Sequence, residues 1–255
     1  MKKCIFFLFF LMLQVSYSQF YQINNGIFGC EIKSVAISGN NVFVGLYEKG
    51  VYFSSDNGNT WYKKDSSFFN RINKNRIYSI VSDRDNIFVC AENGLYLTTD
   101  LGESWEDISK VSGYTTGPIT AITVKGDSIY GIFYMLDLYL STNYGKKWIT
   151  PPLFSYFPDF GGPSLTSVAI KGDNIFIGRV DGILKINQDG REMKNSGLLD
   201  TYINAIIVKD NNLFVGTRGG VFMSPDDGEK WIEKNFGLTN LYINSLVIDG
   251  ENIFA

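Results

Sequence analysis

The sequence contains no histidine. This absence excludes Ser-His-Asp and Cys-His catalytic systems, zinc sites of the His-Glu-x-x-His type and pH switches based on imidazole. Charged residues are also scarce, at 19% against 45% hydrophobic residues, which excludes a highly charged disordered chain. The formal net charge of −3 offers no basic footprint for nucleic acid. We therefore expect a folded protein with no nucleic-acid partner.

A hydrophobic run long enough to span a membrane is also missing. The run Cys4–Leu13 has ten apolar residues, about half of the ~20 that a transmembrane helix needs. Lys2 and Lys3 precede this run, and the small residues Ser16 and Ser18 follow it. Positive charge, apolar stretch and small-residue cleavage site are typical of a signal peptide. We predict a signal peptide over 1–18 and an exported mature chain over 19–255 that is secreted, periplasmic or at the cell surface.

Cysteine is rare as well, with three in the chain. Cys4 would leave with the signal peptide, so Cys30 and Cys90 remain. Export permits a disulfide between them. Their separation in sequence does not say whether their Cα atoms come within about 7 Å, as a disulfide requires. The pairing is therefore an open hypothesis.

The rest of the chain is dominated by an internal repeat. Ser34–Gly45 aligns without a gap on Ser79–Cys90, because both have a β-branched run, a polar turn and a second apolar run. The same phrase recurs, so that repeats begin near residues 34, 79, 121, 167, 205 and 245. A period near 40 residues is typical of propellers and other repeat architectures.

Each repeat contains four short strand-like runs. In the first repeat these are Ser34–Ile37, Val42–Leu46, Val51–Ser54 and Trp61–Lys64, separated by Gly, Asn and Asp. Four short strands per repeat match one blade of a β-propeller. A two-sheet sandwich has no reason to repeat its sequence. We predict an all-β fold, a β-propeller of four-stranded antiparallel blades with five blades and a partial one.

The two ends of the mature chain suggest how the ring continues. Residues 20–25 align on the outer strand that starts at Trp231. Tyr242–Ile248 is a predicted first strand and Asn252–Ala255 a predicted second strand of an incomplete repeat. We expect the natural protein to continue past Ala255 and to complete six or seven blades.

A second recurring phrase follows the third strand of each repeat. It fits the Asp-box pattern Ser/Thr-x-Asp-x-Gly-x-Thr/Ser-Trp, fully or in part, and the fourth copy keeps only Gly190. Its key positions are Ser54, Asp56, Gly58 and Trp61; Thr98, Asp100, Gly102 and Trp105; Ser141, Asn143, Gly145 and Trp148; and Ser224, Asp226, Gly228 and Trp231. The Asp is expected to accept N–H groups of its own turn, the Gly to adopt positive φ, and the Trp to pack on a neighbouring strand. We therefore predict a structural role, while metal ligation is disfavoured because the turns lack the acidic ladder of a calcium loop.

These phrases resemble the Asp-box (BNR) repeat propellers, which include sialidases, sortilin-like receptors, xyloglucanase-type hydrolases and photosystem II assembly-factor-like proteins. The resemblance covers nearly all of the mature chain. It implies that ligands bind the face formed by the loops between the second and third strands and between blades. The longest of these loops runs from 150 to 164. The candidate binding residues on this face are Phe154, Tyr156, Phe157, Asp159, Phe160, Arg179 and Arg218.

Three functions fit these features. The first is an exported, non-catalytic propeller that binds a protein or glycan ligand, with no catalytic residue, metal or cofactor. The second is a glycoside hydrolase with Asp137 and Asp181 as its carboxylate pair, since they occupy similar positions in adjacent blades. A sialidase is disfavoured, because the resemblance would demand an Arg-Ile-Pro signature that does not precede the first box. The third is the extracytoplasmic sensor domain of a longer receptor. The aromatic side chains of the longest loop could alternatively plug a blade junction.

Overall fold

The computed structural model describes residues 31–64, 76–109, 118–133, 137–150 and 164–255, and the regular elements of these ranges are all strands. The strands form antiparallel sheets in which neighbours in sequence are neighbours in space. We call the sheets blades one to six. Blade one contains β1 (Ile32–Ser38), β2 (Asn41–Leu46), β3 (Gly50–Ser54) and β4 (Tyr62–Lys63), and blade two contains β5 (Ile77–Asp83), β6 (Asn86–Ala91), β7 (Gly94–Thr98) and β8 (Glu106–Asp107).

The remaining blades repeat this plan with variations. Blade three has three strands, and the single bridge between Leu140 and Ile149 takes the place of the fourth. Blade six has two strands in the described part of the chain. Their bounds are β9 (Ile119–Lys125), β10 (Ser128–Phe133) and β11 (Asp137–Ser141); β12 (Leu165–Lys171), β13 (Asn174–Arg179), β14 (Gly182–Asn187) and β15 (Gly190–Met193); β16 (Ile203–Lys209), β17 (Asn212–Thr217), β18 (Gly220–Ser224) and β19 (Ile232–Glu233); and β20 (Val247–Asp249) and β21 (Asn252–Phe254).

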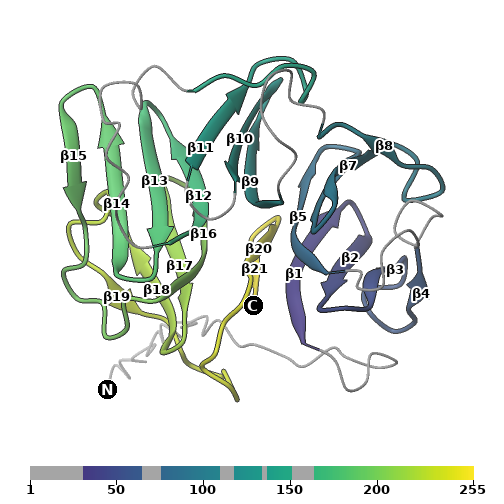
Figure 1. Ribbon diagram of the computed structural model, residues 1–255. Coiled ribbons are helices and arrows are strands. Elements are labelled where there is room, and N and C mark those ends of the chain that lie inside the picture. The colour runs from purple at the N-terminus through teal and green to yellow at the C-terminus, as the bar shows by residue number, and fades with distance from the viewer. Residues whose placement is uncertain (1–30, 65–75, 110–117, 134–136, 151–163) are drawn as a thin grey trace, which may run out of the picture.

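The blades are arranged around a common axis, with the first strand of each blade innermost (Figure 1). The hairpin β20–β21 lies between β16 of blade five and β1 of blade one (Figure 1). The predicted β-propeller is thereby confirmed. The predicted outer strand over residues 20–25 lies outside the described ranges. The two predicted C-terminal strands lie within them and can be compared with the structure.

The predicted strand over Tyr242–Ile248 is wrong in its extent. The structure has only Val247–Asp249 in strand conformation. Its partner β21 supplies three residues, so the ladder ends at the pair Val247 and Phe254. Residues 242–246 have no second strand opposite them in this sheet, and they contact the neighbouring blades instead, as described below.

Blades interlock through a glycine in the second strand. A Cβ added to Gly45 would lie 2.5 Å from Cγ2 of Ile77, the first residue of the next inner strand. Gly216 has the same relation to Ile243, also at 2.5 Å. The bare glycine backbone therefore lets the next blade approach closely. This contact recurs because the sequence recurs.

Side chains of the inner strands, and of the segment that leads into β20, connect neighbouring blades around the axis. Ser34 Oγ accepts from Ile80 N of blade two at 2.8 Å. Ser245 Oγ of blade six accepts from Val35 N of blade one at 3.1 Å, and Asn244 Nδ2 donates to Ile32 O at 3.0 Å. Inner strands of different blades form no ladder with one another, so these bonds satisfy backbone groups that would otherwise face the channel. Blade six is joined to blade one, and the ring is closed.

Candidate functional site

The turns that follow the third strands are held together by side chains of their own residues. In blade one, Ser54 Oγ donates to Asp56 Oδ1 at 2.7 Å and accepts from Gly58 N at 2.9 Å. Asp56 also accepts from the backbone N and the hydroxyl of Thr60, at 2.8 and 2.6 Å. Asn57 and Gly58 both have positive φ, at 56° and 87°. The carboxylate thus satisfies the donors of a tight, left-handed turn.

The same bonds recur in blades two, three and five. Gly102, Gly145 and Gly228 donate through their backbone N to Thr98, Ser141 and Ser224, at 2.8 to 2.9 Å. Asn143 replaces the carboxylate in blade three, and its Oδ1 accepts from Lys147 N at 2.8 Å. The polar side chains of the motif therefore form hydrogen bonds within their own turns, as expected of residues that stabilise the turn.

Hydrogen bonds within the turns shift the acidity of the aspartates. The hydroxyl and backbone N–H of Ser104, followed by the hydroxyl of Thr98, lower the pKa of Asp100 to about 2. The pKa of Asp56 is lowered chiefly by the hydroxyl and backbone N–H of Thr60. Donors that favour the charged form of a carboxyl lower its pKa. Both groups are therefore carboxylates at neutral pH and poor candidates for a general acid.

Three of the four motif tryptophans pack between blades. Trp105, Trp148 and Trp231 are buried, and Trp61 is half-buried. Trp231 Nε1 donates to the carbonyl oxygen of Lys194 in blade four at 2.7 Å. Trp105, Trp148 and Trp231 therefore connect their turns to the preceding blade. Trp61 instead packs within blade one, where its Nε1 donates to the carbonyl oxygen of Gly58 at 3.0 Å.

The predicted binding face is only partly within the described residues. Five candidate residues of the longest loop lie outside them, namely Phe154, Tyr156, Phe157, Asp159 and Phe160. The alternative that the aromatic rings of this loop plug a blade junction therefore stays a prediction. Asp137 begins β11. The described residues of this face, which we call the loop face, come from the β2–β3-type turns and from the segments that join blades.

The two predicted arginines of the loop face have different surroundings. Arg179 donates from Nε and Nη2 to the two carboxylate oxygens of Asp181, at 2.8 and 3.0 Å. Arg218 instead stacks on Tyr202, with its guanidinium carbon 3.6 Å from the ring centroid. The ring centroid of Tyr242 lies 6.0 Å from the same guanidinium carbon. Planar stacking of this kind leaves the N–H edge of an arginine available to a ligand.

A third arginine of this face is held by acidic groups. Arg76 Nη2 lies 3.2 Å from Glu48 Oε1, and its Nη1 lies 3.9 Å from Glu92 Oε1. The guanidinium carbon of Arg76 also lies 5.2 Å from the ring centroid of Tyr47. Among the three described arginines of the loop face, ion pairs therefore engage Arg76 and Arg179 but not Arg218.

Exposed apolar side chains lie in the two segments that place Tyr202 and Tyr242 beside Arg218, and sequence reasoning missed them. Leu199 is 79% exposed and Phe236 is 65% exposed, while Leu241 and Tyr242 are also exposed. We call these four residues with Arg218 and Tyr202 the Arg218 patch. Arg218 lies in the turn between β17 and β18. The other residues come from two segments of similar sequence, 195–203 and 235–243, each of the form Asn-x-Gly-Leu-x-x-x-Tyr-Ile. That second, shorter repeat was the signal available in the sequence.

The segments that carry the Arg218 patch are fixed by polar side chains. Asn195 Oδ1 accepts from Ile183 N at 2.9 Å, and Asn235 Oδ1 accepts from Val221 N at 2.7 Å. Asp200 Oδ1 accepts from the backbone N of Tyr202 at 2.7 Å. Because each segment is tied to the sheet it follows, the exposed side chains are presented in a set arrangement, which reduces the ordering cost of binding.

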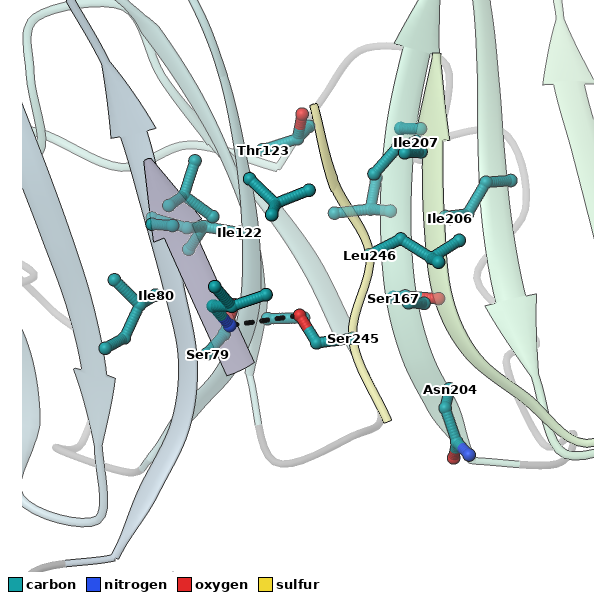
Figure 2. Close-up of a pocket in the computed structure, with 18 of the residues that line it drawn as sticks. Ser79, Ile80, Ile122, Thr123, Ser167, Asn204, Ile206, Ile207, Ser245 and Leu246 are labelled. Carbon is teal, nitrogen blue, oxygen red and sulfur yellow. Dashed lines mark hydrogen bonds between the residues drawn. The ribbon is translucent and has the colours of Figure 1, made fainter. Parts of the chain in front are cut away.

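A cavity of about 400 Å³ lies on the axis, lined by the inner strands. Figure 2 shows apolar side chains such as Ile80, Ile122 and Leu246 in its wall, with Asn204 toward one end. Asn204 Nδ2 donates to the carbonyl oxygen of Ile243 at 2.8 Å. The cavity wall is therefore formed by the same residues that join the blades.

Other predicted features concern metals, membranes and cysteines. Within the described ranges, no cluster of Cys, Asp or Glu is placed to hold a metal ion, and no helix there is long and apolar enough to cross a membrane. Cys90 carries a free, fully buried thiol, and burial raises its pKa. Its hypothetical partner Cys30 lies outside the described residues, so the disulfide stays a prediction.

Comparison with known proteins adds information on the fold. No protein-family profile and no curated protein matches the sequence. Solved structures do match. The extracellular domain of BT4673 from B. thetaiotaomicron has a TM-score of 0.62 at 16% identity, over 93% of this chain and 38% of that one. YCF48 from Cyanidioschyzon merolae has a TM-score of 0.52 at 13% identity, over 78% of this chain and 70% of that one.

An ancestral GH74 enzyme is also similar, with a TM-score of 0.58 at 17% identity, over 92% of this chain and 34% of that one. This chain therefore spans about a third of the length of the BT4673 domain and of the GH74 enzyme. All three are propellers. At such low identity the likeness concerns the fold.

Proposed function

We propose that the protein is an exported, non-catalytic propeller of the Asp-box class that binds a protein ligand through the Arg218 patch. The observation that carries this proposal is that the guanidinium of Arg218 is stacked on an aromatic ring and is not used in an ion pair with a described residue. The stacked ring is that of Tyr202, and Tyr242 lies near the same guanidinium. The segments that carry these two tyrosines also expose Leu199, Phe236 and Leu241. Aromatic and arginine side chains grouped with apolar neighbours are typical of protein-binding hot spots.

Similar proteins support a binding role without deciding the ligand. A YCF48 structure has been solved with a D1 peptide bound. The BT4673 match is an extracellular domain, which agrees with the export that the signal-peptide pattern predicts. The recurrent turn bonds of Asp56, Asp100 and Asp226 support assignment to the Asp-box propellers. The ligand we favour is a peptide with a carboxylate beside apolar side chains, since a carboxylate suits a free guanidinium edge.

Hydrolysis is the less supported alternative. Both carboxylate oxygens of Asp181 accept from Arg179, so this side chain is engaged within its own turn. A glycoside hydrolase needs two carboxyl groups that face the scissile bond of its substrate. The GH74 likeness concerns the fold, so it adds no substrate to this argument.

The proposal can be tested by selecting displayed random peptides on the mature chain. We expect enrichment of peptides with Asp or Glu next to aromatic or aliphatic residues. Arg218→Gln should weaken binding of a selected peptide by at least about tenfold, as loss of a charge-assisted pair implies. Arg191→Gln, on the exposed outer strand β15, is the matched control and should leave affinity unchanged. Selection of peptides without acidic residues, or equal losses in both variants, would contradict the proposal.

A further inference from the structure

The third-strand turn of blade four departs from the pattern of the other blades. Strands β14 and β15 pair up to Asn187 and Gly190, so a two-residue turn replaces the motif. Asn187 Oδ1 accepts from Asp189 N at 3.0 Å. Its Nδ2 is directed out of the turn and donates to Asn174 Oδ1, at the start of β13, at 3.0 Å. A turn that is self-contained elsewhere thus contributes polar atoms to its surroundings.

The facing turn of blade five is also exceptional. Asp227 has a positive φ of 59° and occupies the position held by Asn57, Leu101 and Tyr144 in the other motif turns. Its carboxylate forms an ion pair with Lys171. The carboxylate also lies 3.5 Å from Asn174 Nδ2. Two departures from the repeat therefore meet at one junction, on the face opposite the loop face.

These departures border a hollow that is open to solvent. A cavity of about 420 Å³ lies at the junction, lined by side chains that include Lys171, Asn174, Asn187, Asp189, Asn211 and Asp227. Side chains that serve only to join two blades would be expected to pack without an open volume. At this junction the connected groups of Asn187, Asn174 and Asp227 instead form one wall of a pocket. The arrangement is that of a binding site with pre-positioned polar groups.

The chemistry of the wall selects the ligand. Amide groups of Asn174 and Asn187 offer both donors and acceptors, while Asp227 offers acceptors and Lys171 offers donors. Two exposed carboxylates at the rim, Asp173 and Asp189, disfavour an anionic ligand. An apolar ligand would cover the remaining donors and acceptors of these polar groups without forming hydrogen bonds to them. We propose that this junction binds a neutral carbohydrate, whose adjacent hydroxyl groups both donate and accept. This proposal is independent of the Arg218 patch.

The experiment uses the full mature chain, labelled with nitrogen-15, and the methyl glycosides and disaccharides of glucose, galactose and mannose. We expect changes in amide chemical shift confined to the turns at 171–174, 187–189, 211 and 227, with dissociation constants on the order of millimolar. Asn174→Ala should weaken binding by about tenfold. Asn86→Ala is the matched control, since Asn86 begins β6 as Asn174 begins β13, and it should bind as the parent does.

Several results would overturn the assignment. One is the absence of shifts with every neutral sugar, and another is an equal loss of affinity in Asn86→Ala. Tighter binding of methyl glucuronide than of methyl glucoside would show that the junction prefers an anionic sugar, which would contradict the proposal of a neutral ligand. If Asn174→Ala does not fold, Gln188→Ala on the exposed turn tests the same wall, and it should also lower the affinity. Unchanged affinity in that variant would count against the proposal.

Discussion

At the scale of single residues, glycine determines how closely blades can approach. The Cβ of Gly45→Ala would meet Cγ2 and Cβ of Ile77 at 2.5 and 3.1 Å, and Ile77 is fully buried. Because Cβ is fixed to the backbone, rotation of the side chain cannot relieve the contact. We expect a loss of about 1–3 kcal/mol in the free energy of unfolding, as for other overpacked cores.

Urea denaturation measures this loss. The control is Ile77→Ala, which alone should cost about 2–5 kcal/mol because it leaves a cavity. The double variant should cost less than the sum of the two single variants, since the new methyl group occupies part of that cavity. Strict additivity would mean that Gly45 and Ile77 do not interact in the way their distance indicates.

The carboxylate of Asp100 should make stability depend on pH in the acid range. Its pKa is lowered to about 2 in the folded state, whereas an unfolded aspartate titrates near 3.9. Its contribution is therefore complete above about pH 4 and is lost as the pH falls through about 2. Asp100→Asn should remove this dependence while keeping the turn, since Asn143 accepts the equivalent bond in blade three.

Thermal unfolding between about pH 2 and 5 provides the measurement. The difference in melting temperature between the parent and Asp100→Asn should shrink as the pH falls. Glu103→Gln, at an exposed position of the same turn, is the control for general charge effects. A difference that is constant across this range would show that the Asp100 bonds form equally in the unfolded chain.

At the scale of elements, Lys194 shows which interactions join blades four and five. Its side chain is 5% exposed and its ammonium lies 2.6 Å from carboxylate oxygens of both Glu192 and Glu229. Burial would lower the pKa of Lys194, but the hydrogen bonds that its ammonium donates to the two glutamates outweigh burial and raise the pKa. The alkyl stem meanwhile packs on Gly228, where an added Cβ would lie 2.8 Å from Cβ of Lys194.

Packing should matter more than charge at Lys194. Both glutamates are well exposed, so they regain water when the ammonium is removed. Lys194→Met keeps the stem and should cost at most about 1 kcal/mol, whereas Lys194→Ala should cost about 1–2 kcal/mol more. Chemical denaturation distinguishes the two, and Lys230→Ala on the exposed turn is the neutral control. Equal losses in the Met and Ala variants would assign the effect to charge.

The elements also show what the sequence could and could not predict. Blades were predictable because β-branched runs alternate with Gly and Asn at a constant period, and the turn bonds of Asp56 followed from residue type and spacing alone. The stacking of Arg218 on Tyr202 was not predictable, because it depends on how two loops from different blades are placed. The junction of Asn174 and Asp227 was missed for the same reason. Tyr242–Ile248 was predicted too long because strand length depends on the partner strand.

At the scale of the whole molecule, ring closure should be visible in hydrogen exchange. In an open array the first blade would have one neighbour and would fray, whereas in a ring it has two. Val35 N donates to Ser245 of blade six, as Ile80 N donates to Ser34 of blade one. We therefore expect the amides of Val35 and Ile80 to be similarly protected.

Two matched variants separate the closing contact from its internal equivalent. Ser245→Ala should speed exchange of the Val35 amide by about fivefold to tenfold, the loss expected for one hydrogen bond of about 1 kcal/mol, and should leave Ile80 unchanged. Ser34→Ala should produce the opposite pattern. Exchange of Val35 that is already fast in the parent, or insensitive to Ser245→Ala, would mean that blade six does not stay docked on blade one. The axial cavity would then be open on one side, because β20 forms part of its wall.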